Sequence, residues 1–214
     1  PLIIAAPGVM TPLEAGTHRN DLVSLMDVAA TSLALAGIDV PDSMDSRNLF
    51  NPEYHREYIF ASSDRMSNVI DRVRAVVGTD FQYIRNFMTD RPLMNWGHRE
   101  MMGLAAPEKS SFIAIRRLAE VGELTPAQAA PFAGRVAVEL YHLTEDPDEV
   151  VNLAEDPRYR EQLMRMRAAL AEWIEATGDK GQFPRSGAAM KEITDRYPKS
   201  WLRSPEFEYL HANE

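Results

Sequence analysis

One long amphipathic segment near the C-terminus limits the folds open to this chain of 214 residues most strongly. Asp156 is placed to cap a helix, Pro157 suits the first helical position, and Gly178 suits the helix end. Large apolar side chains recur between these ends at spacings of three and four, at Tyr159, Leu163, Met166, Leu170, Trp173 and Ile174. Burying such a stripe contributes roughly 1.5–3 kcal/mol for each large side chain, so the predicted helix must pack against another layer.

Segments with strand character precede this helix and can supply that layer. Four strands are predicted, at 58–62, 73–77, 81–86 and 136–143. Gly78-Thr79-Asp80 lies between the second and the third of them and suits a tight hairpin turn. Residues 51–184 are therefore predicted to form an α+β subdomain, in which a four-stranded antiparallel sheet packs on the long helix.

The first fifty residues have a different character. Leu2 to Ala6 is a short apolar run closed by Pro7-Gly8, which predicts a buried strand of a parallel sheet. Apolar residues at helical spacing predict a helix from Asn20 to Ala36, capped by Asn20 and ended by Gly37. Residues 1–50 are therefore predicted to be the end of a larger α/β domain.

The remaining segments give weaker signals. Short helices are predicted at 111–121 and 125–133, and 91–107 is predicted to be a loop because it has no clear periodicity. Residues 185–214 are predicted to be a polar C-terminal tail with scattered aromatic anchors at Trp201, Phe207 and Tyr209.

Composition restricts the chemistry more than the fold. The net charge of -9 argues against a nucleic-acid partner, although a local arginine cluster could still meet an anionic sugar. The absence of cysteine excludes disulfides, zinc-thiolate sites and thiol catalysis. No apolar run approaches the roughly 20 residues that span a bilayer, and no signal peptide is predicted within these 214 residues. The chain starts abruptly at Pro1, for which a processed end, a truncation or a broken reading frame would each account.

Several stretches together resemble the late part of type I sulfatases of the alkaline phosphatase superfamily. In the first fifty residues they are Pro1-Leu2-Ile3-Ile4 with Pro7-Gly8, and Leu22 to Val28 with Thr31, followed by Ala36-Gly37-Ile38 with Pro41. Further on they are Asp64-Arg65-Met66, Asp71 to Val76, Tyr83 to Phe87, and Glu139 to Leu143 running into Asp146 to Ala154. The last stretch is the most specific, and the likeness is greatest to bacterial heparan N-sulfatase-like and polysaccharide sulfatases.

The resemblance implies a formylglycine nucleophile, made from Cys or Ser in a Cys/Ser-x-Pro-x-Arg motif, and a calcium ion held by carboxylates and an amide. This sequence has neither that motif nor the expected Asp-Asp ligand pair. The resemblance therefore implies that an upstream catalytic domain holds the reactive centre, and that these 214 residues alone are inactive. It also implies hydrolysis of a sulfate ester or sulfamate on a sulfated carbohydrate, in the periplasm or outside the cell.

Two other functions stay open from the sequence. The chain could be a stand-alone carbohydrate-binding or assembly module that retains only the accessory domain. It could also be the C-terminal part of another hydrolase of the same superfamily, such as a phosphodiesterase. The residues upstream of Pro1 would separate these cases, because only a sulfatase needs the formylglycine motif.

Five residues are candidates for contact with an anionic substrate. Asp64 and Arg65 follow a predicted strand, where a guanidinium could bind sulfate or carboxylate through two parallel hydrogen bonds. Arg72 and Arg74 alternate along the next predicted strand and so share one face. His98 lies beside an aromatic residue in the predicted loop and could border a sugar. Each has a structural alternative: internal ion pairs for the four charged residues and an exposed loop position for His98.

Two acidic sites are predicted to be structural. Asp27 falls inside the first predicted helix, where a buried carboxylate must satisfy backbone or hydroxyl donors because an unpaired charge is costly. Asp146-Pro147-Asp148-Glu149 lacks the glycine and the ligand spacing of a calcium-binding hand, so a turn is predicted there. The five histidines have no metal-ligand spacing, and no metal ligand is predicted in this chain.

Overall fold

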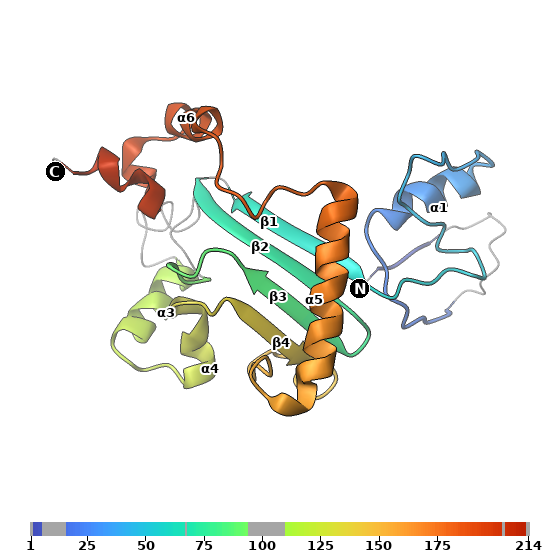
Figure 1. The fold of residues 1–214 in the computed structure, drawn as a ribbon, viewed down its shortest axis with the longest axis horizontal. Helices are drawn as coiled ribbons and strands as arrows, with labels where there is room; N and C mark the ends of the chain where they lie inside the picture. The colour runs from blue at the N-terminus through green and yellow to red at the C-terminus, as the bar shows by residue number, and fades with distance from the viewer. Residues whose placement is uncertain (1, 6–15, 67, 94–109, 203, 213–214) are drawn as a thin grey trace. The chain divides into compact units, whose positions relative to one another are not determined.

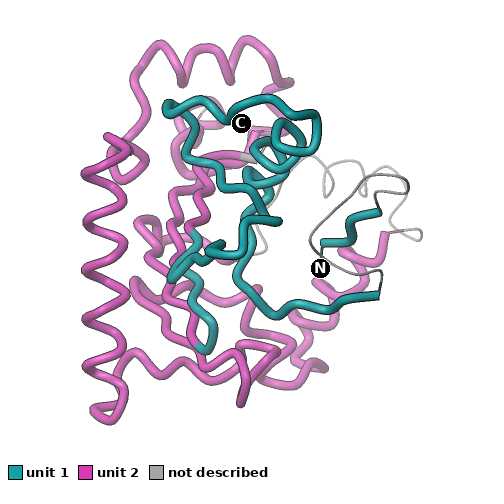
Figure 2. Tube along the Cα trace, turned by 90° about the vertical axis from the view of Figure 1, so that its right-hand side faces the viewer, with its two compact units in different colours: residues 1–59, 77–80 teal, residues 60–76, 81–214 magenta. Residues whose placement is uncertain are grey.

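The computed structural model describes residues 2–5, 16–66, 68–93, 110–202 and 204–212. The chain divides into two compact units, which Figure 2 shows in different colours. Unit 1 comprises residues 1–59 and 77–80, and unit 2 comprises residues 60–76 and 81–214. The division into segments 1–50, 51–184 and 185–214 stays a prediction.

A four-stranded sheet forms the middle of unit 2 (Figure 1). Its strands lie in chain order and are β1 (Ile59–Met66), β2 (Val69–Val77), β3 (Phe81–Asn86) and β4 (Val138–His142). β3 and β4 are antiparallel, with Phe81 opposite His142 and Arg85 opposite Val138. The predicted sheet is confirmed, and the predicted bounds of β3 are those observed. β1 and β2 extend further than predicted. The added residues include polar ones that are only partly buried, so they gave no apolar strand pattern in the sequence.

The long helix α5 (Arg160–Thr177) runs over this sheet, as predicted (Figure 1). A 3-10 turn at Pro157–Tyr159 precedes it, and the Asp156 carboxylate accepts the backbone N–H of Arg158 at 2.9 Å. Gly178 ends the helix in the left-handed conformation, with φ of 63°, as its sequence position indicates. On the covered face, Trp173 stacks on Phe60 of β1, with ring centroids 5.2 Å apart.

Two shorter helices lie elsewhere in unit 2, at α3 (Ser111–Glu120) and α4 (Pro126–Ala129). α3 matches its prediction to within one residue, whereas the predicted helix at 125–133 is α4 followed by a 3-10 turn. Thr125 caps α4 in a capping box with Gln128, and a proline at 131 favours the tighter turn that follows. No helix in the described ranges is long and apolar enough to cross a membrane.

The predicted polar tail at 185–214 is corrected by the structure. It folds into α6 (Gly187–Arg196) and two 3-10 helices, at Lys199–Trp201 and Pro205–Leu210. Three of its apolar side chains complete a buried cluster with residues of the sheet region, and the cluster consists of Ile70, Met88, Ile193, Leu202 and Phe207. Phe207 is one of the predicted aromatic anchors. Ile193 and Leu202 were not predicted to be core, because the segment has too few apolar residues for a periodic pattern.

Unit 1 is built around α1 (Asp27–Leu35), which is shorter than the predicted helix from Asn20 to Ala36. Asn20 does not cap it, because the chain before Asp27 is irregular. The Asp27 carboxylate instead accepts the backbone N–H of Ser24 at 3.1 Å and holds the turn that leads into the helix. Gly37, with φ of 71°, ends the helix as predicted.

The predicted buried strand at Leu2–Ala6 is wrong for the residues that the structure describes. Residues 2–5 have no strand geometry, and the side chain of Ile3 is 91% exposed. A strand needs neighbouring backbone to satisfy its N–H and C=O groups, and no described strand pairs with this segment. Ala6 lies outside the described residues.

Candidate functional site

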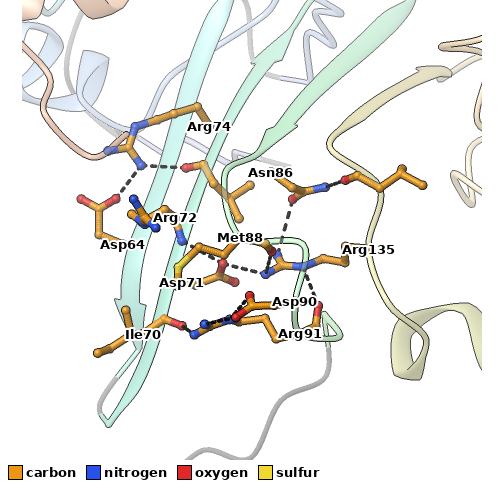
Figure 3. A network of polar contacts seen from close by, with 12 residues as sticks. Asp64, Ile70, Asp71, Arg72, Arg74, Asn86, Met88, Asp90, Arg91 and Arg135 are labelled. Carbon is orange, nitrogen blue, oxygen red and sulfur yellow. Dashed lines mark hydrogen bonds and ion pairs between the residues drawn. The ribbon is translucent and has the colours of Figure 1, made fainter. Parts of the chain in front are cut away.

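Arg74 on β2 is the centre of a buried ion-pair cluster, and Figure 3 shows its contact with Asp64. Its guanidinium donates two hydrogen bonds to the Asp179 carboxylate, both at 2.8 Å, and one to Asp64 Oδ1 at 2.7 Å. It also donates to the backbone carbonyl of Val73 at 2.7 Å. These carboxylates raise the pKa of Arg74, and the guanidinium in turn lowers the pKa of Asp179. Because Arg74 is 0% exposed, its donors are used inside the protein.

Gly181 closes this cluster by lying directly against it. A Cβ atom at this position would be 1.4 Å from Arg74 Nη2 and 2.6 Å from Asp64 Oδ1. Any side chain at 181 would therefore displace the guanidinium from its carboxylates. We call the assembly of Asp64, Arg74, Asp179 and Gly181 the arginine clasp.

Arg72 lies two residues before the clasp arginine and contacts the same distant segment. Its Nη1 donates to the backbone carbonyl of Gln182 at 3.0 Å. The shared face predicted for Arg72 and Arg74 thus meets the chain that leaves α5. In the described structure both side chains bind groups of the protein itself, which is the alternative to substrate contact that the sequence left open.

Arg65 differs from its charged neighbours. It is half-buried in β1, and the structure gives it no ion pair or hydrogen bond within the described part of the chain. Successive side chains of a strand point to opposite faces, so Arg65 points away from Asp64 and the arginine clasp. Of the three arginines among the predicted site residues, Arg65 alone has no hydrogen bond or ion pair with another described residue. His98 lies outside the described residues.

A second arginine on the other side of β3 fastens the sheet to the chain before β4 (Figure 3). Arg135 donates to Asp71 Oδ1 at 2.7 Å and to the backbone carbonyls of Met88 and Arg91 at 3.2 and 3.3 Å. Its side chain is only 6% exposed. The contacts are those of a structural link between β2, the end of β3 and the approach to β4.

Arg91 fastens the C-terminal segment to the same region. It donates to the carbonyl of Ile70 at 2.9 Å and binds both carboxylate oxygens of Glu206, at 2.7 and 3.1 Å. Asp90 binds the same guanidinium at 2.9 Å. Although burial opposes its charge, the two carboxylates raise the pKa of Arg91.

In unit 1, Asp27 has the structural role predicted for it. Its side chain is 0% exposed and accepts from Arg56 Nε at 2.7 Å, from the Tyr54 hydroxyl at 2.8 Å and from the Arg47 backbone N–H at 2.8 Å. Burial works toward a higher pKa, but these donors together hold the pKa of Asp27 at about 2. The carboxylate is therefore a structural anion rather than a proton-transfer group.

Carboxylates gather on β4 and the turn after it, and Glu139, Asp146 and Glu149 have no ion pair within the described part of the chain. The Tyr141 hydroxyl donates to Glu139 at 2.6 Å, and Gln82 donates to Glu149 at 2.9 Å. Burial and the neighbouring charges of Glu139 and Asp146 raise the pKa of Glu149. Glu149 has φ of 53°, within the left-handed region, in the turn predicted from the sequence.

The described residues do not fit the calcium ion or the formylglycine that the sequence resemblance implies. In the parts of the chain that the structure describes, no three His, Cys, Asp or Glu side chains are arranged to hold a metal ion. Asp64 and Asp179 are bound by Arg74, and Asp71 is bound by Arg135. A guanidinium without a protein partner, as in Arg65, has the donors that an anion can accept.

Asp179 and Gly181 were not predicted from the sequence. The helix end at Gly178 can be read from the sequence, and a short acidic-glycine stretch directly after it is a visible signal of a turn. Nothing in that stretch identifies Arg74, 105 positions earlier, as its partner.

Comparison with known proteins supplies names for relatives of this chain. An ulvan-active sulfatase of Formosa agariphila is 32% identical over 191 residues, which are 87% of this chain and 30% of that protein. A second ulvan-active sulfatase of the same organism is 27% identical over 188 residues, covering 84% of this chain and 33% of that protein. The chain thus spans about a third of the length of the curated relatives it matches. No protein-family model matches it.

Among solved structures, a 2-O GAG sulfatase superposes with a TM-score of 0.45 at 21% identity, over 72% of this chain and 25% of that one. A protein solved in complex with its substrate D-glucosamine-2-N,6-O-disulfate superposes with a TM-score of 0.46 at 14% identity. That match covers 74% of this chain and 25% of the other. At such values these superpositions add no argument to the sequence relationship.

Proposed function

This chain is a relative of the C-terminal part of sulfatases, and we propose that it works within a longer polypeptide that hydrolyses sulfate esters or sulfamates on carbohydrates. The observation that carries the proposal is the 32% identity to an ulvan-active sulfatase over 191 residues. A sulfated polysaccharide is too large and too charged to cross a membrane, so the proposal also places the protein in the periplasm or outside the cell.

The test of the activity is an assay of the longest natural polypeptide that carries these residues. We expect it to release inorganic sulfate from sulfated oligosaccharides of ulvan, measured by ion chromatography. A phosphodiester, bis(4-nitrophenyl) phosphate, serves as the competing substrate. Faster turnover of the phosphodiester, or binding of the oligosaccharide without sulfate release, would contradict a sulfatase and favour one of the other two functions.

Within that polypeptide, we propose that these 214 residues act as a scaffold and as one wall of the substrate mouth. The nucleophile and the calcium ligands are proposed to lie in another part of the polypeptide, because this sequence contains no cysteine and no Ser-x-Pro-x-Arg motif. The purified 214-residue chain is expected not to hydrolyse an aryl sulfate such as 4-nitrocatechol sulfate. Turnover by this chain alone would end the proposal that the reactive centre lies elsewhere.

Arg65 is the proposed contact with the substrate. Its guanidinium can bind a sulfate group through two parallel N–H donors, and a hydrogen bond to a charged group contributes about 1.5–3 kcal/mol. Arg65→Ala is therefore expected to raise KM for the sulfated oligosaccharide roughly tenfold or more. Arg65→Lys keeps the charge but cannot make the bidentate hydrogen bonds of a guanidinium, so its KM should lie between those of the wild type and Arg65→Ala.

The matched control is Arg158→Ala. Arg158 pairs with Asp156 at the surface, and its side chain is 79% exposed. This substitution removes the same charge from the protein without touching the proposed wall, and KM should not change. An equal rise in KM for both variants would show a general effect of net charge and would remove Arg65 from the site.

A further inference from the structure

The chain that follows α5 passes over β1 and β2 before it enters α6 (Figure 1). We call residues Asp179–Leu202 the C-terminal strap. One end of the strap joins the sheet through the arginine clasp, where Asp179 binds Arg74. The other end joins the connection between β1 and β2, where Asn68 Nδ2 donates to the carbonyl of Trp201 at 2.5 Å.

Both attachments are buried and leave little freedom. Arg74 is 0% exposed and Asn68 is 1% exposed. At the first attachment, Gly181 lies so close that a Cβ atom at this position would displace the Arg74 guanidinium. At the second, Leu202 of the strap packs in the same buried cluster as Ile70 of β2. The strap is therefore bound to the sheet region at both of its ends.

Arg65 lies between these two points along the chain. The clasp holds the residue before it, since Asp64 binds Arg74 at 2.7 Å, and Asn68 is held only three residues after it. Fixing the backbone on both sides restricts the directions in which the Arg65 side chain can project. A guanidinium that is already directed at its ligand loses less conformational entropy when it binds.

We propose that the C-terminal strap is a positioning element, which holds Arg65 in the orientation needed to bind the sulfate group of the substrate. This inference rests on the proposed contact between Arg65 and the substrate. Asp64, Asn68, Arg74 and Asp179 act through Arg65 and do not touch the substrate themselves.

The test is a double-substitution cycle in the longest natural polypeptide that carries these residues. Asp179→Asn keeps the shape of the side chain but removes the charge that binds Arg74. It is expected to raise KM roughly threefold to tenfold with little change in kcat, because the orientation of a binding group is lost and the chemistry is not. Hydrogen exchange measured by mass spectrometry should become faster in residues 59–70.

The decisive readout is the combination of Asp179→Asn with Arg65→Ala. If the strap acts through Arg65, the double variant should have nearly the KM of Arg65→Ala alone. Additive effects on KM would overturn the positioning role. The positioning role would also be overturned if Asp179→Asn changed neither KM nor hydrogen exchange while Arg65→Ala raised KM. In that case the proposed contact of Arg65 with the substrate would stand. An unchanged KM in Arg65→Ala would instead remove the contact itself.

A control and a second variant protect the test from trivial loss of folding. Asp195→Asn removes an exposed ion pair with Lys191 on the same strap and should change neither KM nor exchange at 59–70. Asn68→Ser releases the opposite end of the strap without disturbing the clasp, and the same non-additive pattern with Arg65→Ala is expected. If Asp179→Asn unfolds at the assay temperature, the cycle with Asn68→Ser decides the question by the same criteria.

Discussion

Both units of this molecule contain a buried ion-pair cluster, and the clusters around Asp27 and Arg74 are built around opposite charges. In unit 1 the centre is an anion, Asp27, surrounded by donors from Arg56, Tyr54 and the backbone. In unit 2 the centre is a cation, Arg74, surrounded by two carboxylates and a carbonyl. A buried charge is tolerated only when its hydrogen-bonding capacity is filled, and either sign can serve.

The clusters around Asp27 and Arg74 differ in which parts of the chain their surrounding groups connect. The donors around Asp27 belong to a local fold of about thirty residues, so its role is to hold unit 1 together. The acceptors around Arg74 come from β1 and from the chain after α5, and one of them, Asp64, adjoins Arg65. An arginine at the centre can therefore link distant segments to a candidate ligand-binding residue, because its fork offers donors in several directions.

Removing the central anion should have the largest effect. Asp27→Ala leaves the largely covered Arg56 guanidinium without its buried carboxylate, and breaking a buried pair in this way costs about 3–5 kcal/mol. The free energy of unfolding of unit 1, measured by denaturant titration, should fall by that amount. A loss below roughly 1 kcal/mol would mean that Arg56 finds another partner and that the comparison between the units fails.

The second largest loss of stability is expected when a side chain is added next to the Arg74 guanidinium. Gly181→Ala places a methyl group on the Arg74 guanidinium and forces the ion pairs apart, for which a loss of about 3 kcal/mol is expected. The control is Gly187→Ala, since no atom lies within 4 Å of a Cβ added at that position. Thermal unfolding of the two variants should differ clearly, and equal melting temperatures would show that the clasp yields without cost.

Acid should weaken unit 1 through Asp27. The folded pKa of about 2 lies below the unfolded value of 3.8, so the stabilisation is complete above the unfolded value and is lost as pH falls through the folded pKa. Between about pH 5 and pH 2 this carboxylate should contribute a loss of roughly 2 kcal/mol. Acid titration of stability by circular dichroism should show a shallower decline in Asp27→Asn than in the wild type.

The smallest effect is expected where carboxylates meet without a cation. The folded pKa of Glu149 is raised, so its protonated form is favoured and stability falls as pH rises through that pKa. Glu149→Gln can still accept from Gln82 but carries no charge near Glu139 and Asp146, and it should stabilise the protein by less than about 1 kcal/mol at pH 7. Destabilisation by this substitution at neutral pH would show that the carboxylates are not in conflict.

The candidate site was only partly accessible from the sequence. Alternation along a strand correctly placed Arg72 and Arg74 on one face, because the strand period is a local property. The same pattern does not predict that Arg72 and Arg74 contact the chain after α5. Nor does it predict that Arg65 stays unpaired in the described structure. Pairing of this kind depends on which distant segment folds back over the sheet.

The sequence by itself determined the C-terminal end of α5, the bounds of β3 and the left-handed glycines at 37 and 178, because capping, periodicity and backbone freedom act within a few residues. Only the tertiary structure decided that the segment after residue 185 is core, that Gly181 has no room for a side chain, and that residues 2–5 form no strand. These features depend on contacts between residues far apart in the chain, and such contacts exist only once the elements have packed.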